Sequence, residues 1–133
     1  MLTISCWFFF GCKTYKADNL PSKQLIFGSG GGISGGVKEY IILENGQIFT
    51  RNSLSNEISE LPKVKKKTAK ALYQKYEANL QSVECDDPGN LYYFLTMKDD
   101  TTKTHKMIWS GNGDAPALAK SFYIKCTELV KQK

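Results

Sequence analysis

The dipeptide Asn45-Gly46 constrains the fold more than any other feature of the chain, because it separates two β-prone runs. Residues 37 to 44 and 47 to 50 are rich in β-branched and aromatic side chains. Both central positions of a type I′ turn need positive φ angles, which Asn and Gly tolerate well. The sequence therefore predicts an antiparallel hairpin here, preceded by a short strand over residues 24 to 27.

A second hairpin is expected over residues 91 to 110. The β-prone run from 91 to 98 is followed by a polar turn at 99 to 102 and by a return run. In the return run His105, Met107 and Trp109 occupy alternate positions, so they share one face of a strand. Residues 52 to 61, between the hairpins, are polar and are expected to be irregular.

Two segments have the three-to-four-residue apolar spacing of amphipathic helices. The first extends from Pro62, which suits a first helical turn, to about Leu80. The second begins with Asp114 as the N-cap and Pro116 in its first turn. Its apolar stripe, expected to face the sheet, consists of Leu118, Phe122, Cys126 and Leu129. The order β-β-β-α-β-β-α predicts a small α+β domain, with about four to five antiparallel strands and both helices packed on one face.

The first twelve residues are almost entirely apolar and end in Gly11-Cys12, which resembles the cleavage site of a bacterial lipoprotein signal peptide. The segment departs from that pattern because no Lys or Arg precedes the apolar run and Phe9 replaces the usual Leu. A start codon assigned too far downstream would explain the missing basic residues, and a buried N-terminal strand is the alternative. The expected organisation is a signal peptide over residues 1–11, a polar tether over 12–23 and a single α+β domain over 24–133.

The expected link to a membrane is a lipid on Cys12, because no apolar run reaches the roughly 18 residues of a transmembrane helix. Lys13 follows that cysteine in place of an acidic inner-membrane retention residue, so the outer membrane is preferred over the inner membrane. The net charge of +5 comes from lysines spread along the chain. Their one local cluster is Lys63, Lys65, Lys66 and Lys67. A solvated helix face explains this cluster, and no nucleic-acid partner is expected.

Four cysteines are present, and the signal-peptide hypothesis assigns them different fates. Cys6 leaves with the signal peptide and Cys12 carries the lipid, which leaves Cys85 and Cys126 as an even pair in an oxidising compartment. A disulfide between them is one expectation. Two reduced, buried thiols are the alternative, because Cys126 lies on the apolar helical stripe and packs acceptably as a small hydrophobe.

The most unusual internal feature is a glycine-rich stretch: Gly28, Ser29, Gly30, Gly31, Gly32, Ile33, Ser34, Gly35 and Gly36. A phosphate-binding loop would need a helix directly afterwards, whereas a strand is expected from Val37. Two interpretations remain open. The stretch is a flexible hairpin loop or bulged edge, or it presents its backbone to a partner protein, as in β-augmentation.

No catalytic, metal or cofactor site is expected from the sequence. His105 is the only histidine and lies mid-strand. The acidic pairs Asp86-Asp87 and Asp99-Asp100 fall in turns, whose residue preferences explain them. These residues and spacings form no Ser-His-Asp, Cys-His or zinc-ligand arrangement.

The ordered motifs resemble emfourin, a family of small bacterial inhibitors of thermolysin-like metalloproteases. The likeness lies in residues 30 to 35 followed by a strand, in Leu61-Pro62, in the strand at 91 to 94, and in the Asp-containing loop before residues 116 to 118. The resemblance covers roughly residues 25 to 130 and implies a loop presented to a protease cleft. The glycine stretch and the Asn-Gly hairpin are also similar to those of uncharacterised lipoproteins of the Bacteroidota.

The functional hypothesis is a lipid-anchored protein of the cell envelope that is monomeric, non-catalytic and binds another protein, with a protease as the candidate partner. One alternative is an envelope enzyme with hydrolytic activity, carried by His105 and the loop carboxylates. The other is a purely structural lipoprotein.

Overall fold

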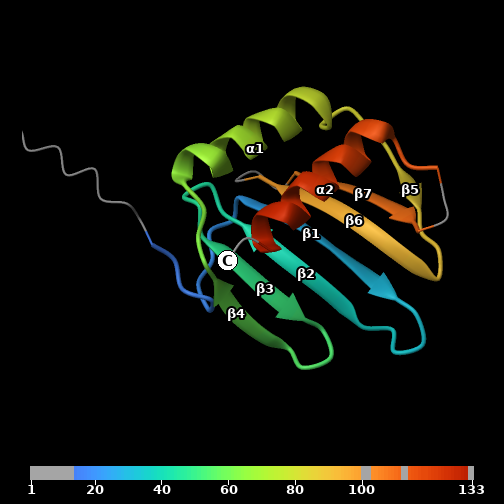
Figure 1. Ribbon diagram of the computed structural model, residues 1–133, viewed down its shortest axis with the longest axis horizontal. Coiled ribbons are helices and arrows are strands. Elements are labelled where there is room, and N and C mark those ends of the chain that lie inside the picture. The colour runs from blue at the N-terminus through green and yellow to red at the C-terminus, as the bar shows by residue number, and fades with distance from the viewer. Residues whose placement is uncertain (1–13, 100–102, 112–113, 132–133) are drawn as a thin grey trace, which may run out of the picture.

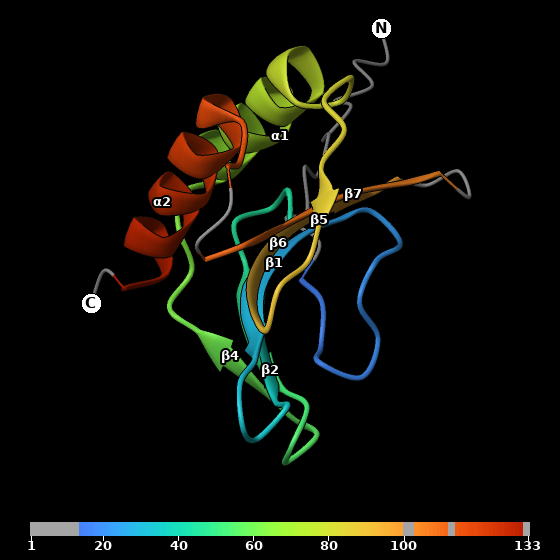
Figure 2. The same cartoon turned by 90° about the vertical axis from the view of Figure 1, so that its right-hand side faces the viewer.

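Seven strands form one sheet in the described part of the chain, and two helices cover one of its faces (Figures 1 and 2). The computed structural model describes residues 14–99, 103–111 and 114–131. The elements in chain order are β1 (Gln24–Gly31), β2 (Val37–Ile42), β3 (Ile48–Asn52), β4 (Glu57–Leu61), α1 (Lys66–Asn79), β5 (Asp86–Asp87), β6 (Leu91–Lys98), β7 (Thr104–Ser110) and α2 (Ala117–Lys131). The expected α+β class is confirmed, although the sheet is larger than expected.

The spatial order of the strands is β4-β3-β2-β1-β6-β7-β5. Neighbouring strands are antiparallel, except that the two-residue β5 runs parallel to β7. Strand β1 lies inside the sheet, with Leu25 opposite Ile42 of β2 on one side and opposite Met97 of β6 on the other. Both edges of β1 are therefore occupied by neighbouring strands.

The sequence failed to predict β4, because its five residues include two glutamates and a serine. The strand pairs with β3 in antiparallel register after a turn in which Asn56 has a φ angle of 55°. Ile58 packs against the apolar cluster on one face of the sheet, and Leu61 packs against the cluster on the other. Charged side chains suit this position, since β4 is an edge strand that must not pair with other chains.

The hairpin predicted at Asn45-Gly46 is present, but its turn is not type I′. Gly46 has a φ of 98°, whereas Asn45 is not among the residues with positive φ. The amide of Gly46 donates to the carbonyl of Leu43, and the amide of Leu43 donates to the carbonyl of Gln47. This pattern fits a type I turn followed by one left-handed glycine, which needs positive φ at a single position.

The larger apolar cluster lies between the sheet and the helices. From α1 it buries Leu72, Tyr73 and Tyr76. Helix α1 begins at Lys66 rather than at Pro62, because residues 62 to 65 are an extended connection in which the amide of Val64 donates to the carbonyl of Gly46.

The predicted stripe of α2 is partly wrong. Phe122 and Cys126 are buried as expected and Leu129 is partly buried, but Leu118 is 57% exposed. Ala119 is fully buried in its place. Positions 119, 122 and 126 share one helical face at spacings of three and four residues, which turns position 118 towards solvent.

A second, smaller cluster lies on the opposite face of the sheet, called the back face here, where Figure 2 shows residues 14 to 22 crossing the strands on the side away from the helices. Tyr15, Ala17 and Leu20 pack against the buried residues of this cluster. Its buried members are Ile26, Ile41, Leu43, Phe49 and Phe94. The described part of the segment expected to be a polar tether is therefore packed against the sheet, because its apolar side chains cover a face that the helices leave open.

Cys85 and Cys126 are both free thiols, so the structure does not contain the expected disulfide. The alternative of two reduced, buried thiols holds for Cys126, whereas Cys85 is reduced but only partly buried. Cys126 is completely buried, and burial raises the pKa of its thiol to about 12. The thiol of Cys85 donates to the carbonyl of Ile108 at 3.4 Å. Burial raises the pKa of Cys85 too, and Asp87 and Asp86 raise it further.

Candidate functional site

The two ends of the sheet differ in chemistry, and Figure 1 shows them on opposite sides of the molecule. The proximal end is defined by Thr14, the turn at residues 44 to 46 and the lysines from Lys63 to Lys66. The distal end is defined by the loops at residues 32 to 36 and 53 to 56 and by Leu91. Eight-residue strands such as β1 separate the two ends by roughly 26 Å, at about 3.3 Å per residue.

The glycine-rich stretch is divided between a strand and a loop. Its first four residues, Gly28 to Gly31, belong to β1. A Cβ atom on Gly28 would lie 2.1 Å from the carbonyl oxygen of Lys38. Gly31 has a φ of 92°, and a Cβ there would lie 1.8 Å from the carbonyl oxygen of Asn90. These glycines permit close strand approach: β6 pairs with Gly28 to Gly31 along one edge, and β2 pairs with Gly28 to Gly30 along the other. An extended peptide therefore cannot add to the sheet along Gly28 to Gly30, which corrects that part of the β-augmentation hypothesis.

The rest of the stretch, Gly32 to Gly36, forms a tight loop at the distal end. The amide of Gly35 donates to the carbonyl of Gly32 at 3.2 Å, and the hydroxyl of Ser34 accepts from the amide of Gly36 at 3.4 Å. Ile33 stands at the tip and is fully exposed, at 110% of the reference area. The loop thus presents an apolar side chain to solvent on a constrained backbone.

Two further exposed apolar side chains adjoin this loop. Leu54, 67% exposed, lies against Gly36, where a Cβ atom would come within 2.9 Å of it. Leu91, 60% exposed, lies against Gly32, with a corresponding distance of 3.3 Å. We call Ile33, Leu54 and Leu91 the distal rim. Its three side chains come from three separate segments that the fold brings together.

A shallow groove of about 300 Å³ lies between α2 and the ends of β6 and β7. Its aromatic lining is a cluster in which the ring centroid of Tyr123 lies 5.4 Å from Tyr93 and 5.6 Å from Trp109. Burial raises the pKa of Tyr123 to about 12, and Tyr93 adds to that effect. Tyr93 lies two residues from Leu91 on β6, so the groove continues the apolar character of the distal rim along the helix-covered face.

At the proximal end, Gln47 attaches the N-terminal segment to the sheet. Its side chain is almost completely buried, at 3% exposure for the residue. The side-chain oxygen accepts from the amide of Tyr15 at 2.8 Å and from the side chain of Asn45 at 2.7 Å. The side-chain nitrogen donates to the carbonyl of Tyr15 at 3.0 Å and to Glu60 at 3.1 Å. These bonds hold Tyr15 at the proximal end, where the neighbouring Thr14 and the lysines line one hollow.

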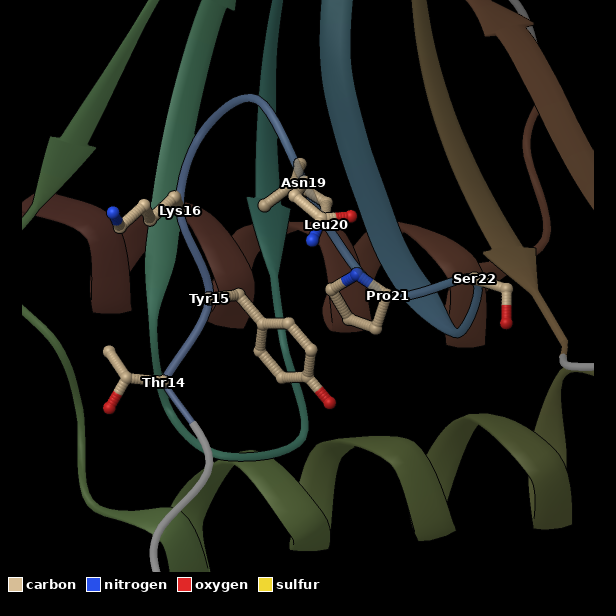
Figure 3. A pocket seen from close by; sticks show the side chains of 7 residues that line it. All are labelled: Thr14, Tyr15, Lys16, Asn19, Leu20, Pro21 and Ser22. Atoms are coloured by element: carbon tan, nitrogen blue, oxygen red, sulfur yellow. The ribbon is translucent and has the colours of Figure 1, made fainter.

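A cavity of about 650 Å³ lies within this N-terminal segment, and Figure 3 shows that all its labelled lining residues belong to that segment. The loop is held by a bond from the amide of Asn19 to the carbonyl of Lys16 at 3.0 Å. The lining residues are Thr14, Tyr15, Lys16, Asn19, Leu20, Pro21 and Ser22. The only charged side chain in this set is that of Lys16, so the cavity offers no acid–base pair.

His105 is part of a structural hydrogen-bond network. Its Nε2 lies 2.8 Å from the carbonyl oxygen of Val83, and its Nδ1 lies 2.5 Å from the hydroxyl of Tyr76. A carbonyl only accepts, so Nε2 carries the proton and the tyrosine hydroxyl donates to Nδ1. Both ring nitrogens are therefore engaged in holding α1 and the following connection to β7.

The acidic pairs do not join this histidine in a metal site. Asp86 and Asp87 lie exposed on β5, Asp99 is exposed, and Asp100 lies outside the described residues. Within the described ranges, no group of three or more His, Cys, Asp or Glu side chains is placed to hold a metal ion. Cys12, the predicted lipidation site, also lies outside the described residues.

No known protein-family model matches the chain, and no curated protein matches it. Among the described residues, no helix is long and apolar enough to cross a membrane. Sequence reasoning identified Ile33 as part of a candidate surface but missed Leu54, Leu91 and Gln47. Two sequence features indicated the proximal end: the Asn45-Gly46 turn, which places Gln47 directly after it, and the lysine cluster at residues 63 to 67.

Proposed function

We propose that this protein is a non-catalytic protein-binding module of the cell envelope, held to the outer membrane by a lipid on Cys12 and binding its partner through the distal rim. The observation that carries the proposal is the placement of the two ends. Thr14, two residues after Cys12, lines the lysine hollow at the proximal end. The exposed apolar side chains Ile33, Leu54 and Leu91 belong to the loops of the distal end.

The chemistry of the distal rim supports a protein partner. Isolated exposed apolar residues are normal on protein surfaces, but here Leu54 and Leu91 adjoin the two ends of the loop that carries Ile33, which gives one end of the sheet an apolar rim. The groove beside Tyr93 and Tyr123 adds aromatic side chains, which are enriched in protein interfaces. The loop at residues 32 to 36 is held by its own hydrogen bonds, so binding would cost little additional backbone ordering.

A protease is the candidate partner, on the strength of the resemblance to emfourin. A constrained loop with a single apolar side chain at its tip has the shape expected of a segment that enters a protease cleft. Ile33 is the residue we assign to that contact. The protein would act as a monomer, with no cofactor and no nucleic acid.

The binding proposal is tested by site-specific photo-crosslinking in the native host, with the crosslinking residue at position 33 and, as a matched control, at exposed Gln74 of α1. We expect one discrete protein adduct from position 33 and none from position 74. An Ile33→Ser substitution should remove co-purification of that partner while leaving the free energy of unfolding unchanged. Equal adducts from both positions, or none from position 33, would contradict the proposal and favour a purely structural envelope protein.

The protease proposal has a separate test. The purified protein is titrated into thermolysin, and peptide hydrolysis is measured with the original chain and with Ile33→Ser. Inhibition by the original chain that the substitution weakens at least tenfold supports the inhibitor function. A partner captured at position 33 without any inhibition would retain the binding module and exclude a thermolysin-like target.

A further inference from the structure

The lysine cluster predicted to be a solvated helix face lies at the proximal end, beside Thr14. Lys63, Lys65, Lys66 and Lys67 are all exposed. The first three line a hollow of about 390 Å³ whose lining also includes Thr14, Asn45, Gln47 and Val64. The positively charged lysines and Thr14, the residue two positions after Cys12, therefore lie on the same surface.

No ion pair among the described residues neutralises these lysines. The first turn of α1 contains no acidic residue, and its N-cap, Lys65, makes no side-chain capping bond. The ion pairs of the described residues involve Lys23 and Arg51, and none involves the cluster. The amides at a helix N-terminus carry partial positive charge, so lysines here oppose the helix dipole. Helix stability would favour acidic residues, so this composition points to a partner of negative charge.

The distance from the predicted anchor is bounded by chain connectivity. Cys12 is two residues before Thr14, and an extended chain covers at most about 3.6 Å per residue. The Cα atom of Cys12 is therefore within about 7 Å of Thr14. The Debye length at physiological ionic strength is about 8 Å, so a lipid on Cys12 would bring the lysine hollow within the range of headgroup charge.

We propose that Lys63, Lys65, Lys66 and Lys67 form a docking surface for anionic lipid headgroups, which holds the proximal end against the membrane. This inference rests on the proposed lipid anchor and adds an orientation to it. The lipid supplies attachment, and the lysines select one face of the domain, as a basic cluster does beside an acyl chain. The distal rim then points away from the membrane, with roughly 26 Å of β1 between the two ends.

Lysine footprinting of the full-length protein in membranes isolated from its native host tests this orientation. A membrane-impermeant amine-acetylating reagent is applied before and after detergent solubilisation, and peptides are quantified by mass spectrometry. Exposed Lys125 of α2, which lies outside the lining of the groove beside Tyr123, is the internal control. We expect at least fivefold lower labelling of the four cluster lysines in membranes than in detergent, with equal labelling of the control.

The same measurement in reconstituted vesicles identifies the lipid chemistry. Protection is expected in vesicles that contain phosphatidylglycerol, and it should disappear in pure phosphatidylcholine and in 1 M salt, where the Debye length falls to about 3 Å. Protection that persists in neutral vesicles and in high salt would overturn electrostatic docking on anionic headgroups.

The intact mass of the protein in each sample separates this inference from the anchor. An acylated chain whose cluster lysines are labelled equally in membranes and in detergent overturns the docking surface and leaves the anchor in place. An unacylated chain with protected lysines overturns the anchor and retains the docking surface. An unacylated chain without protection overturns both.

Discussion

The side-chain amide of Gln47 binds both backbone polar groups of Tyr15, accepting from its N–H at 2.8 Å and donating to its C=O at 3.0 Å. The buried side chain of Gln47 thus makes the two backbone hydrogen bonds with Tyr15 that a neighbouring strand would make in a sheet. The two residues are separated by 32 positions in the chain, so this contact decides where the N-terminal segment meets the sheet.

Gln47→Ala should release that segment. The substitution leaves the amide and carbonyl of Tyr15 without their partner, and the expected loss in the free energy of unfolding is about 1–3 kcal/mol. Trypsin cleavage after exposed Lys16 should accelerate in parallel. Asn52→Ala, at the opposite end of β3, is the matched control. Equal cleavage rates at Lys16 in both variants would show that Gln47 does not hold the segment.

Gly28→Ala should destabilise the fold severely, because the new Cβ would lie 2.1 Å from the backbone oxygen of Lys38. Relief requires β1 and β2 to separate, at an expected cost of about 3 kcal/mol or more. Gly111→Ala is the control, since its Cβ would meet only Tyr93 at an ordinary 3.5 Å. Urea denaturation measures both, and a Gly28→Ala protein as stable as the control would contradict the assigned close approach.

Cys126 should resist alkylation in the native state. Its thiol is fully buried and burial raises its pKa to about 12, so little nucleophilic thiolate exists at pH 8. Iodoacetamide labelling followed by peptide mapping should modify Cys126 only after denaturation. Recovery of a peptide in which Cys85 and Cys126 are joined would instead establish the disulfide that the structure lacks.

Stability should fall as the pH rises above about 10, and Tyr73 should contribute to the fall. Burial raises the pKa of its hydroxyl, which donates to the carbonyl of Ile42 and accepts from the amide of Leu25. Below pH 10 the Tyr73 hydroxyl keeps its proton in both the folded and the unfolded protein. Above pH 10 only the unfolded protein releases that proton, so the free energy of unfolding falls as the pH rises. Each such group contributes at most about 1.4 kcal/mol per pH unit.

The Tyr73→Phe variant tests this sign. It should be less stable at neutral pH by about 1–3 kcal/mol, because Leu25 and Ile42 lose their partner. Between pH 10 and 11 its stability should decline less steeply than that of the original chain. Gln74→Ala, on the exposed side of the same helix, should keep the original slope. A steeper decline in Tyr73→Phe would contradict the assignment.

His105→Leu should weaken folding, since it leaves the hydroxyl of Tyr76 and the carbonyl of Val83 without their partner. The expected loss is about 1–3 kcal/mol in the free energy of unfolding, measured by chemical denaturation. A variant of unchanged stability that lost a hydrolytic activity of the original chain would contradict the structural role and support the envelope-enzyme alternative.

Local sequence patterns predicted the two hairpins and the two helices better than they predicted the number of strands in the sheet. The two hairpins and two helices follow from turn residues and apolar spacing around Asn45-Gly46 and in the stripe of Phe122 and Cys126. Edge strand β4 is polar, and β5 has only two residues, so neither carries a local pattern. The packing of Tyr15 on the back face depends on Gln47, a contact that no window of the sequence contains.

The candidate site shows the same limit. The sequence correctly marked the glycine-rich stretch as unusual, but it did not show that Gly28 and Gly31 serve strand packing. The reason lies in distant backbone atoms: the oxygen that excludes a side chain at Gly31 belongs to Asn90. The exposed tip at Ile33 and its neighbours Leu54 and Leu91 emerge only when the loops are placed together.

The most direct test of the account is the intact mass of the protein purified from membranes of its native host, because both the lipid anchor and the orientation of the two ends relative to the membrane depend on Cys12. The account predicts a mature chain that begins at acylated Cys12 and whose mass does not change on reduction. A chain that begins at Met1 without modification would contradict the lipid anchor and the membrane orientation built on it.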